Sequence, residues 1–147
     1  METKSVTLDD LIGMRALSLM QPWASALFLG LKHYETRSWP TRYRGPLLIH
    51  AAKGFPIYAL DFANTCGHIK SDLPLGAIIG LVQLLDVQPT FPLSQDLTAL
   101  ECMYGDYSPG RWAWKLADPV LFAEPIPYRG ALGIWTVRAV PEPGATR

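Results

Sequence analysis

The chain has 147 residues, of which 49% are hydrophobic and 18% are charged. This length suits a single domain with a sizeable core, and the composition excludes long disordered segments. Thirteen Lys and Arg residues balance thirteen Asp and Glu residues, so the net charge gives no support for a polyanionic partner. No stretch reaches the roughly 20 apolar residues of a membrane span, and no leader pattern is visible, so we expect a cytoplasmic protein with no membrane partner.

Prolines and glycines are frequent, with 13 of the former and 12 of the latter. They favour short elements and many turns, so we expect an α+β fold, a small β-barrel with flanking helices. Residues 1–13 are predicted to be a peripheral N-terminal extension, in which Thr7 and Asp10 have the spacing of a capping box. The domain is predicted over residues 14–140, and residues 141–147 are predicted to form a C-terminal tail. We expect a monomer.

The first elements of this domain are a strand and a helix. Residues 16–19 suit a strand, and Pro22 suits the first turn of a helix because that position needs no intrahelical N–H partner. Apolar residues that include Trp23 recur at helical spacing and predict a buried face, so we expect Trp23 to belong to the core. Gly30 allows the left-handed conformation that commonly ends a helix.

Residues 33–37 are predicted to form a charged strand after this helix. Period-two alternation places His33, Glu35 and Arg37 on one face, and Lys32 lies at the entrance of the strand. A carboxylate near Lys32 favours the protonated amine, so the simplest interpretation is an ion-paired set that directs Lys32 and Arg37 toward a phosphate. If Lys32 and Glu35 instead share one proton, they could act as base and acid in a hydrolysis.

The rest of the chain is predicted to combine strands with short helices. Gly80 is expected to bend a long strand, and the prolines at positions 119, 125 and 127 demand an extended path like that of an edge strand. The predicted strands cover residues 46–51, 76–87, 111–116 and 133–137, and the predicted helices cover residues 56–66 and 93–104.

Basic residues are concentrated between residues 14 and 53. This section contains one acidic residue, Glu35, and six basic ones: Arg15, Lys32, Arg37, Arg42, Arg44 and Lys53. A basic section in a neutral protein is typical of an anion-binding face, because local potential guides a phosphate. An ordinary solvated surface would give the same pattern, so charge alone leaves both interpretations open.

The potential metal ligands are scattered. Cys66 and Cys102 lie far apart and the three histidines form no pair at ligand spacing, so we expect free thiols, no metal and no cofactor. His50, within an apolar strand, is predicted to be a hydrogen-bonded core histidine.

Four segments of the chain form a recognisable series. They are the opening at residues 16–23, a GxKxxExR signature at Gly30, Lys32, Glu35 and Arg37, and two later segments at residues 111–114 and 130–135. This series resembles the ASCH domain, a family of the PUA-like β-barrel group, over residues 14–140. The resemblance implies a PUA-like barrel whose cleft lies beside the signature strand, and it implies a role associated with RNA.

The resemblance also implies two kinds of chemistry at the signature. Some ASCH-type proteins hydrolyse acylated cytidine with a lysine and a threonine nucleophile, but this chain has Glu35 at the position of the threonine. The same mechanism would then need an activated water or another nucleophile, such as Ser18 or Thr36. Other members are connected with RNA cleavage, in which the cationic side chains could stabilise a developing phosphorane.

We therefore expect RNA or a modified nucleoside as the partner, with hydrolysis of RNA as the leading hypothesis. Hydrolysis of N-acylated cytidine, RNA binding without catalysis and protein binding through aromatic loops remain open. The predicted catalytic residues are Lys32, Glu35 and Arg37. The predicted binding residues are Gln21 for a base edge, Trp39 for stacking, Lys53 for a phosphate, and the loop residues Arg42 and Arg44.

Overall fold

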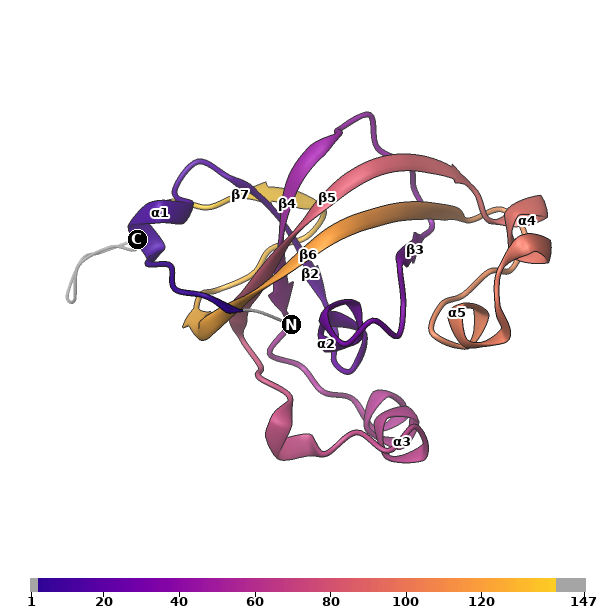
Figure 1. The fold of residues 1–147 in the computed structure, drawn as a ribbon, viewed down its shortest axis with the longest axis horizontal. Coiled ribbons are helices and arrows are strands. Elements are labelled where there is room, and N and C mark those ends of the chain that lie inside the picture. The colour runs from indigo at the N-terminus through magenta and orange to yellow at the C-terminus, as the bar shows by residue number, and fades with distance from the viewer. Residues whose placement is uncertain (1–2, 140–147) are drawn as a thin grey trace.

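The computed structural model of this protein describes residues 3–139, which have a mixed α+β fold (Figure 1). The strands are β1 (Thr3–Lys4), β2 (Arg15–Leu19), β3 (Tyr34–Arg37), β4 (Gly45–Ala51), β5 (Ala77–Pro89), β6 (Trp112–Pro127) and β7 (Ile134–Thr136). The helices are α1 (Leu8–Leu11), α2 (Trp23–Phe28), α3 (Ile57–Thr65), α4 (Thr90–Leu93) and α5 (Ala99–Met103), with two 3₁₀ turns, η1 (Lys70–Asp72) and η2 (Ser94–Asp96). The predicted C-terminal tail lies outside the described residues.

The seven strands of the described chain belong to one sheet. Their order is β1-β6-β5-β4-β2-β7, and β3 also pairs with β6. β5 and β6 are long antiparallel partners, whereas β2 runs parallel to β4. Within residues 3–139 no strand pairing joins β3 to β2 or β7, so the sheet does not close into a ring. The predicted α+β class is confirmed, and the predicted barrel is not.

β3 and β2 approach each other without pairing, and one side chain spans the gap between them. Nη2 of Arg37 donates a hydrogen bond of 2.7 Å to the carbonyl oxygen of Ser18. The next carbonyl, that of Leu19, accepts from Ala52 on the β4 side, so the Ser18 carbonyl faces the opposite side of β2. β7 reaches only as far as Leu17 there. We call this gap between β3 and β2 the seam.

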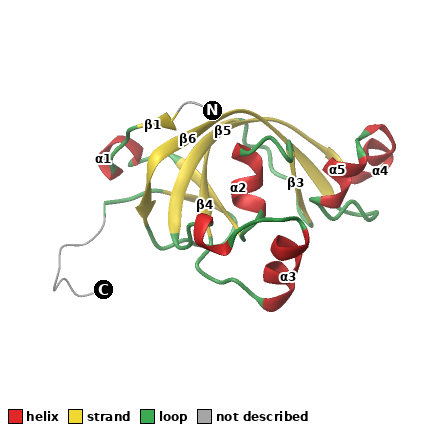
Figure 2. Ribbon diagram, turned by 60° about the horizontal axis from the view of Figure 1, so that its bottom comes forward, coloured by secondary structure: helices red, strands yellow, loops and turns green. Residues whose placement is uncertain are grey.

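Helix α2 packs inside the curve of the sheet (Figure 2). It has only six residues, too few to be stable alone, and it forms because Ala24, Leu27 and Phe28 are buried in the core. The Phe28 ring takes the space beside Gly80, where a Cβ atom would lie 2.4 Å from the ring. Gly30 follows α2 with a φ of +76°, so the predicted left-handed glycine is confirmed.

Residues 3–13 pack against the sheet. β1 pairs with β6, and α1 places Leu11 in a second apolar cluster with Ile78 and Phe122. The backbone amide of Thr7 donates to Oδ2 of Asp10 at 2.8 Å, one half of the predicted capping box. The described part of the segment predicted to be peripheral, residues 3–13, therefore covers part of the core.

The predicted helix over residues 93–104 is wrong in its extent. The chain forms α4, η2 and α5 instead, and it is extended at Leu97 and Thr98 between the last two. The reason is that the Thr98 side chain accepts a hydrogen bond from the Glu101 amide, which makes Thr98 the N-cap of a new helix.

β6 begins near the predicted strand 111–116 but continues to Pro127. It accommodates Pro119 and Pro125 because its pairing with β5 shifts register near both of them. β5 pairs along one side of β6, whereas on the other side β3 pairs only with residues 112–115 and β1 only with residues 121–122. Among the described residues, Pro119, Pro125 and Pro127 therefore lie where this other side of β6 has no paired strand, which agrees with the predicted edge-like path.

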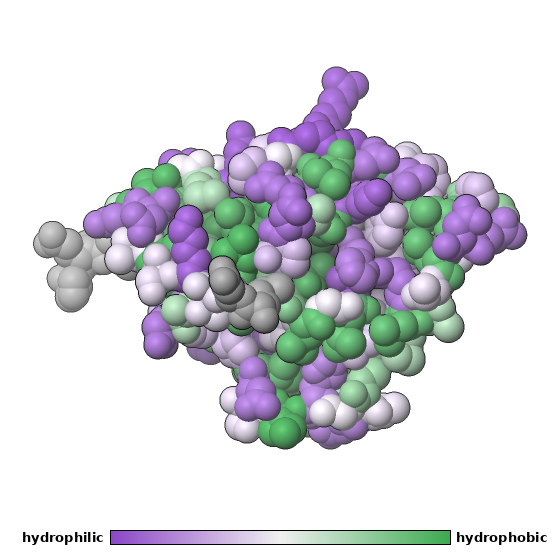
Figure 3. All heavy atoms as spheres, viewed as in Figure 1, coloured by the Kyte–Doolittle hydropathy of each residue, from purple (hydrophilic) through white to green (hydrophobic). Residues whose placement is uncertain are grey.

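Several hydrophobic side chains are exposed, among them Leu29, Ile57, Tyr58 and Leu132. Figure 3 shows hydrophobic residues reaching the surface over α2. In the part of the chain that the structure describes, no helix has the length and apolar character needed to cross a membrane.

Candidate functional site

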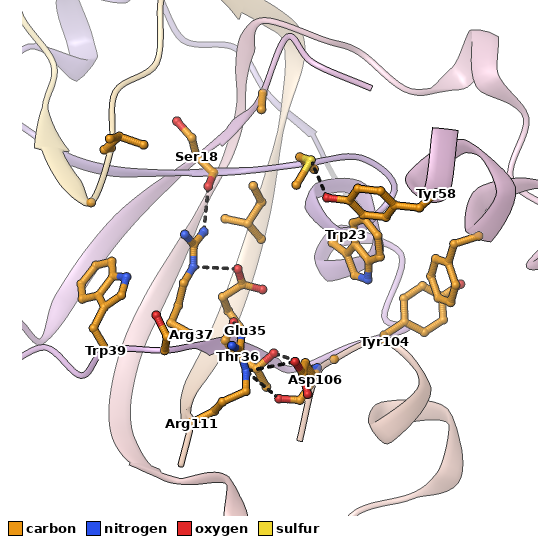
Figure 4. Close-up of a pocket in the computed structure, with 18 of the residues that line it drawn as sticks. Ser18, Trp23, Glu35, Thr36, Arg37, Trp39, Tyr58, Tyr104, Asp106 and Arg111 are labelled. Carbon is orange, nitrogen blue, oxygen red and sulfur yellow. Dashed lines mark hydrogen bonds and ion pairs between the residues drawn. The ribbon is translucent and has the colours of Figure 1, made fainter. Parts of the chain in front are cut away.

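A cleft of about 760 Å³ opens at the seam (Figure 4). One side is made by the end of β2 and by β3, and the other by α2, α3, the segment after α5 and the loop before β7. Segments that are far apart in sequence therefore meet at the place where the sheet is interrupted.

The polar base of the cleft is formed by the signature residues. Glu35 Oε2 accepts a hydrogen bond of 3.0 Å from Nε of Arg37, and Oε1 accepts one of 2.9 Å from Nζ of Lys32. Glu35 and Arg37 share a face of β3, as the period-two alternation predicts, and both line the cleft. Arg37 is thus fixed by two contacts, to Glu35 and to the Ser18 carbonyl.

The Glu35 carboxyl is ionised at neutral pH. Burial by itself raises its pKa, but the positive charges of Lys32 and Arg37 and their hydrogen bonds outweigh this effect and hold the pKa below its ordinary value. Glu35 therefore accepts hydrogen bonds and balances positive charge, and it does not hold a proton to donate.

Lys32 does not reach the cleft. Its exposed fraction is 1%, and it lies behind Glu35 beside a smaller hollow that is also lined by Leu27 and Val82. Of the three predicted catalytic residues, Glu35 and Arg37 line the cleft and Lys32 does not. Lys32 lies two residues before β3, and its Nζ forms an ion pair of 2.9 Å with Glu35 in the interior.

A second ion pair lies across the cleft floor. Arg111 Nε donates to the carbonyl oxygen of Asp106 at 3.1 Å, its Nη2 donates to the carbonyl oxygen of Thr36 at 3.3 Å, and its guanidinium lies 3.4 Å from the Asp106 carboxylate. Hydrogen bonds from Ser108 are the main reason that the pKa of Asp106 is lowered. The ionised groups that line the cleft are therefore balanced, with two arginines and two carboxylates.

Aromatic side chains form the walls of the cleft. The Trp23 ring stacks on Phe62 at a centroid distance of 5.2 Å, and Phe62 meets Tyr104 edge-on at the same distance. Tyr58 lies next to Trp23, and Figure 4 shows Trp39 on the other side of Arg37 from these rings. The prediction that Trp23 belongs to the core is corrected, because its half-buried ring is part of the cleft wall.

Tyr104 is a neutral phenol at physiological pH. Burial is the main cause that raises its pKa to about 12, and its hydroxyl hydrogen-bonds Nε2 of His68 at 2.8 Å. Tyr104 is brought to the cleft by α5, which is attached to the start of β3. The Glu101 carboxylate accepts hydrogen bonds of 2.9 Å from the amide of His33 and from its Nδ1.

The predicted binding residues divide into three groups: one lines the cleft, one is buried, and three are exposed outside the cleft. Trp39 lines the cleft, and its ring also meets the buried Trp114 edge-on at a centroid distance of 4.9 Å, so its role in stacking a base stays a prediction. Gln21 does not, because it is fully buried and its amide is engaged by Ser25 and by the carbonyl oxygen of Pro74, so the expectation that it reads a base edge is corrected. The residues that are exposed but outside the cleft are Arg42, Arg44 and Lys53.

His50 is a buried, hydrogen-bonded histidine, as predicted. Its Nε2 lies 2.7 Å from the carbonyl oxygen of Tyr128, and its Nδ1 lies 3.0 Å from Oγ of Ser18. Because a carbonyl oxygen only accepts, Nε2 carries the proton and Nδ1 accepts from the serine hydroxyl. Burial lowers the pKa of His50, against the opposing effect of the bond to Tyr128, so the imidazole is neutral at pH 7.

Potential metal ligands do not cluster in the described part of the chain: no group of three His, Cys, Asp or Glu side chains there is arranged to hold an ion. Cys66 and Cys102 are free cysteines.

The sequence model of the ASCH domain family matches residues 17–126 of this chain. The chain belongs to the ASCH domain family. This ASCH domain is similar to "Activating signal cointegrator 1" of Homo sapiens, with 38% identity over 79 residues, and to the protein of the same name in Mus musculus, with 37% identity. Each match covers 48% of this chain and only 14% of the relative, so the chain spans a small part of the length of these curated relatives.

The fold of this ASCH domain also matches solved structures. The crystal structure of ASCH from Zymomonas mobilis has a TM-score of 0.55 at 16% identity, and the match covers 84% of this chain and 87% of that one. A mutant of the same protein has a TM-score of 0.56 at 18% identity, with coverage of 84% and 89%. At these identities the likeness shows a shared fold.

Sequence reasoning missed most of the aromatic wall of this ASCH domain. Tyr58 and Phe62 come from a helix, and Tyr104 from the turn after another, that no motif marked; Arg111 opens the segment 111–114, to which no role was assigned. The available signal was the aromatic and aliphatic residues Ile57, Tyr58, Leu60 and Phe62 in the predicted helix 56–66, because a helix that buries only part of its apolar surface leaves the rest for a ligand or a partner.

Proposed function

We propose that this ASCH domain binds single-stranded RNA or a modified nucleoside, with a base held in the cleft between its aromatic walls. The observation that carries the proposal is the position of Arg37 between Trp39 on one side and Trp23 on the other. Stacking on aromatic rings is tolerant of sequence because every base has a π-face, and a guanidinium next to the rings offers hydrogen bonds to a base or a phosphate.

The balanced charges of the cleft support a base or nucleoside over a run of phosphates as its occupant. Glu35 and Asp106 neutralise the two arginines, so the cleft itself has little net attraction for a polyanion. The family to which the chain belongs is associated with RNA, which agrees with this choice of ligand. The predicted contacts of Arg42 and Arg44 would then lie outside the cleft, along the course of a longer strand.

The test is a binding titration with a fluorescein-labelled single-stranded hexauridine. We expect Trp39→Leu to weaken binding by about 5- to 150-fold, the loss that corresponds to one stacked base. Lys115→Ala, an exposed cation on β6 that does not line the cleft, should leave the affinity unchanged. Equal affinities of Trp39→Leu and the wild type would refute the proposal.

Hydrolysis is the second candidate function of the same cleft. It is favoured by an ionised Glu35 that faces the cleft beside Arg37, since the carboxylate could orient a water and the guanidinium could stabilise a developing negative charge. Lys32 would then act through Glu35 as a positioning residue. Incubation with single-stranded RNAs and N-acylated cytidines, read by mass, should give products with the wild type and none with Glu35→Gln; unchanged mass with every substrate would remove this candidate.

A further inference from the structure

A second hollow of about 780 Å³ adjoins the cleft on the other side of Ser18. The two spaces share Ser18, Ala52, Ala131 and Leu132 as a common wall. A ligand that fills the cleft can therefore continue into the second hollow over this wall. Leu132 stands on it with an exposed fraction of 98%, free to pack against a ribose or a base.

The charge of the second hollow differs from that of the cleft. Its lining includes Lys53 and Arg129 and no acidic residue. Within residues 3–139 neither cation belongs to an ion pair, whereas each arginine of the cleft is paired with a carboxylate. An anionic group that lies between the two spaces is therefore drawn toward the second hollow.

The common wall is held in place by a chain of hydrogen bonds. The Ser18 hydroxyl donates to Nδ1 of His50, whose Nε2 donates to the carbonyl oxygen of Tyr128, and Nε1 of Trp135 donates to Ser18 Oγ at 3.2 Å. Gly130 packs directly on this chain: a Cβ atom there would lie 2.6 Å from Ser18 Oγ and from the His50 ring. The loop that carries Arg129 is thus fixed against β2 and β4, and the hollow is preformed.

We propose that the second hollow binds the phosphate that follows the base in the cleft, so that the complete site takes a strand of at least two nucleotides. Lys53 and Arg129 supply the charge, and the wall at Ser18 separates the base from the phosphate. This inference rests on the proposed function, because it assigns the base to the cleft.

The test compares ligands with and without the phosphate. Uridine, the dinucleotide UpU and hexauridine are titrated into the wild type and followed by NMR chemical shifts, which detect weak binding. We expect UpU to bind about tenfold or more tightly than uridine, the size of a charge-assisted contact, and Lys53→Ala with Arg129→Ala to abolish this gain while the affinity for uridine stays unchanged. Lys70→Ala, an exposed cation on η1 outside both spaces, is the matched control and should behave as the wild type.

Salt dependence gives a second readout. Loss of one phosphate contact should lower the slope of log K against log salt for hexauridine by about 0.7. If uridine binds but UpU binds no more tightly, or if the double variant keeps the gain, the second hollow is not a phosphate site and the proposed function stands. If neither uridine nor hexauridine binds the wild type, the proposed function and this inference fail together.

Discussion

Lys32 shows how one residue can be predicted correctly as part of a site and wrongly in its role. The signature identifies it, and its Nζ does meet Glu35, but full burial turns it from a ligand contact into a support for the carboxylate. Glu35 has a second cationic partner in Arg37, while Lys32 has only Glu35 among the ion pairs of residues 3–139. Removing Lys32 therefore leaves Glu35 with a counter-charge, whereas removing Glu35 leaves Lys32 without one.

This difference predicts that replacing Glu35 destabilises the protein more than replacing Lys32. Glu35→Gln leaves the buried Lys32 charge without a counter-charge and should lower the free energy of unfolding by about 3–5 kcal/mol. Lys32→Met removes the charge and keeps the volume, so its loss should be smaller because Glu35 keeps Arg37. Urea unfolding measures both, and the double variant should recover part of the loss of Glu35→Gln. Equal losses, or no recovery, would contradict this account of the pair.

The buried imidazole of His50 makes the stability of the protein depend on pH. Its pKa is lowered in the folded protein, so the unfolded chain binds the proton first as the pH falls below roughly 6.5. The stability that depends on the neutral imidazole is present above that pH and is lost on acidification toward the folded-state pKa. Between pH 7.5 and 5.5 the melting temperature of the wild type should fall more than that of His50→Gln. If the melting temperatures of the two proteins fall by the same amount over this pH range, protonation of the His50 imidazole does not oppose folding.

At the scale of the element, local signals predicted strands well because each strand repeats its pattern over several residues. β2, β4 and β5 begin and end within about two residues of their predicted limits. The prediction of one helix over residues 93–104 failed because a single side chain sets where α5 begins. Thr98 caps α5 and divides a stretch that looks continuous in composition. A cap works through geometry at one position, which periodicity does not register.

The contact between β5 and α2 gives a prediction for Gly80. Because a Cβ atom there would overlap both the Phe28 ring and the carbonyl oxygen of Val120, Gly80→Ala should lower the free energy of unfolding by about 1–3 kcal/mol. Gly54→Ala is the matched control, since nothing lies within 4 Å of its added methyl and it should be near neutral. Urea unfolding of the two variants measures the difference, and equal stability would show that the α2 packing yields without strain.

At the scale of the whole molecule, the sequence predicted the α+β class and the family, both of which the structure and the comparisons confirm. It did not predict that the sheet stays open at the seam. It also did not predict the aromatic wall, because Trp23 and Tyr58 come from two helices and Tyr104 from the turn after a third, and their meeting is a property of the tertiary structure. The limits of the charged strand β3 could be predicted from the sequence, but the aromatic side chains across the cleft from it could not.

Among the described residues, one guanidinium, that of Arg37, bridges the seam through its hydrogen bond to the Ser18 carbonyl oxygen. We expect a ligand that draws Arg37 away from the Ser18 carbonyl oxygen to loosen the contact between β2 and β3, and a ligand that binds without breaking this bond to stabilise the contact. Hydrogen–deuterium exchange distinguishes the two: the amides of β3 should exchange faster in Arg37→Gln than in the wild type, and bound hexauridine should slow them in the wild type alone. Ligand binding and the stability of the β2–β3 contact would then be coupled, and the exchange rates of the β3 amides would report both.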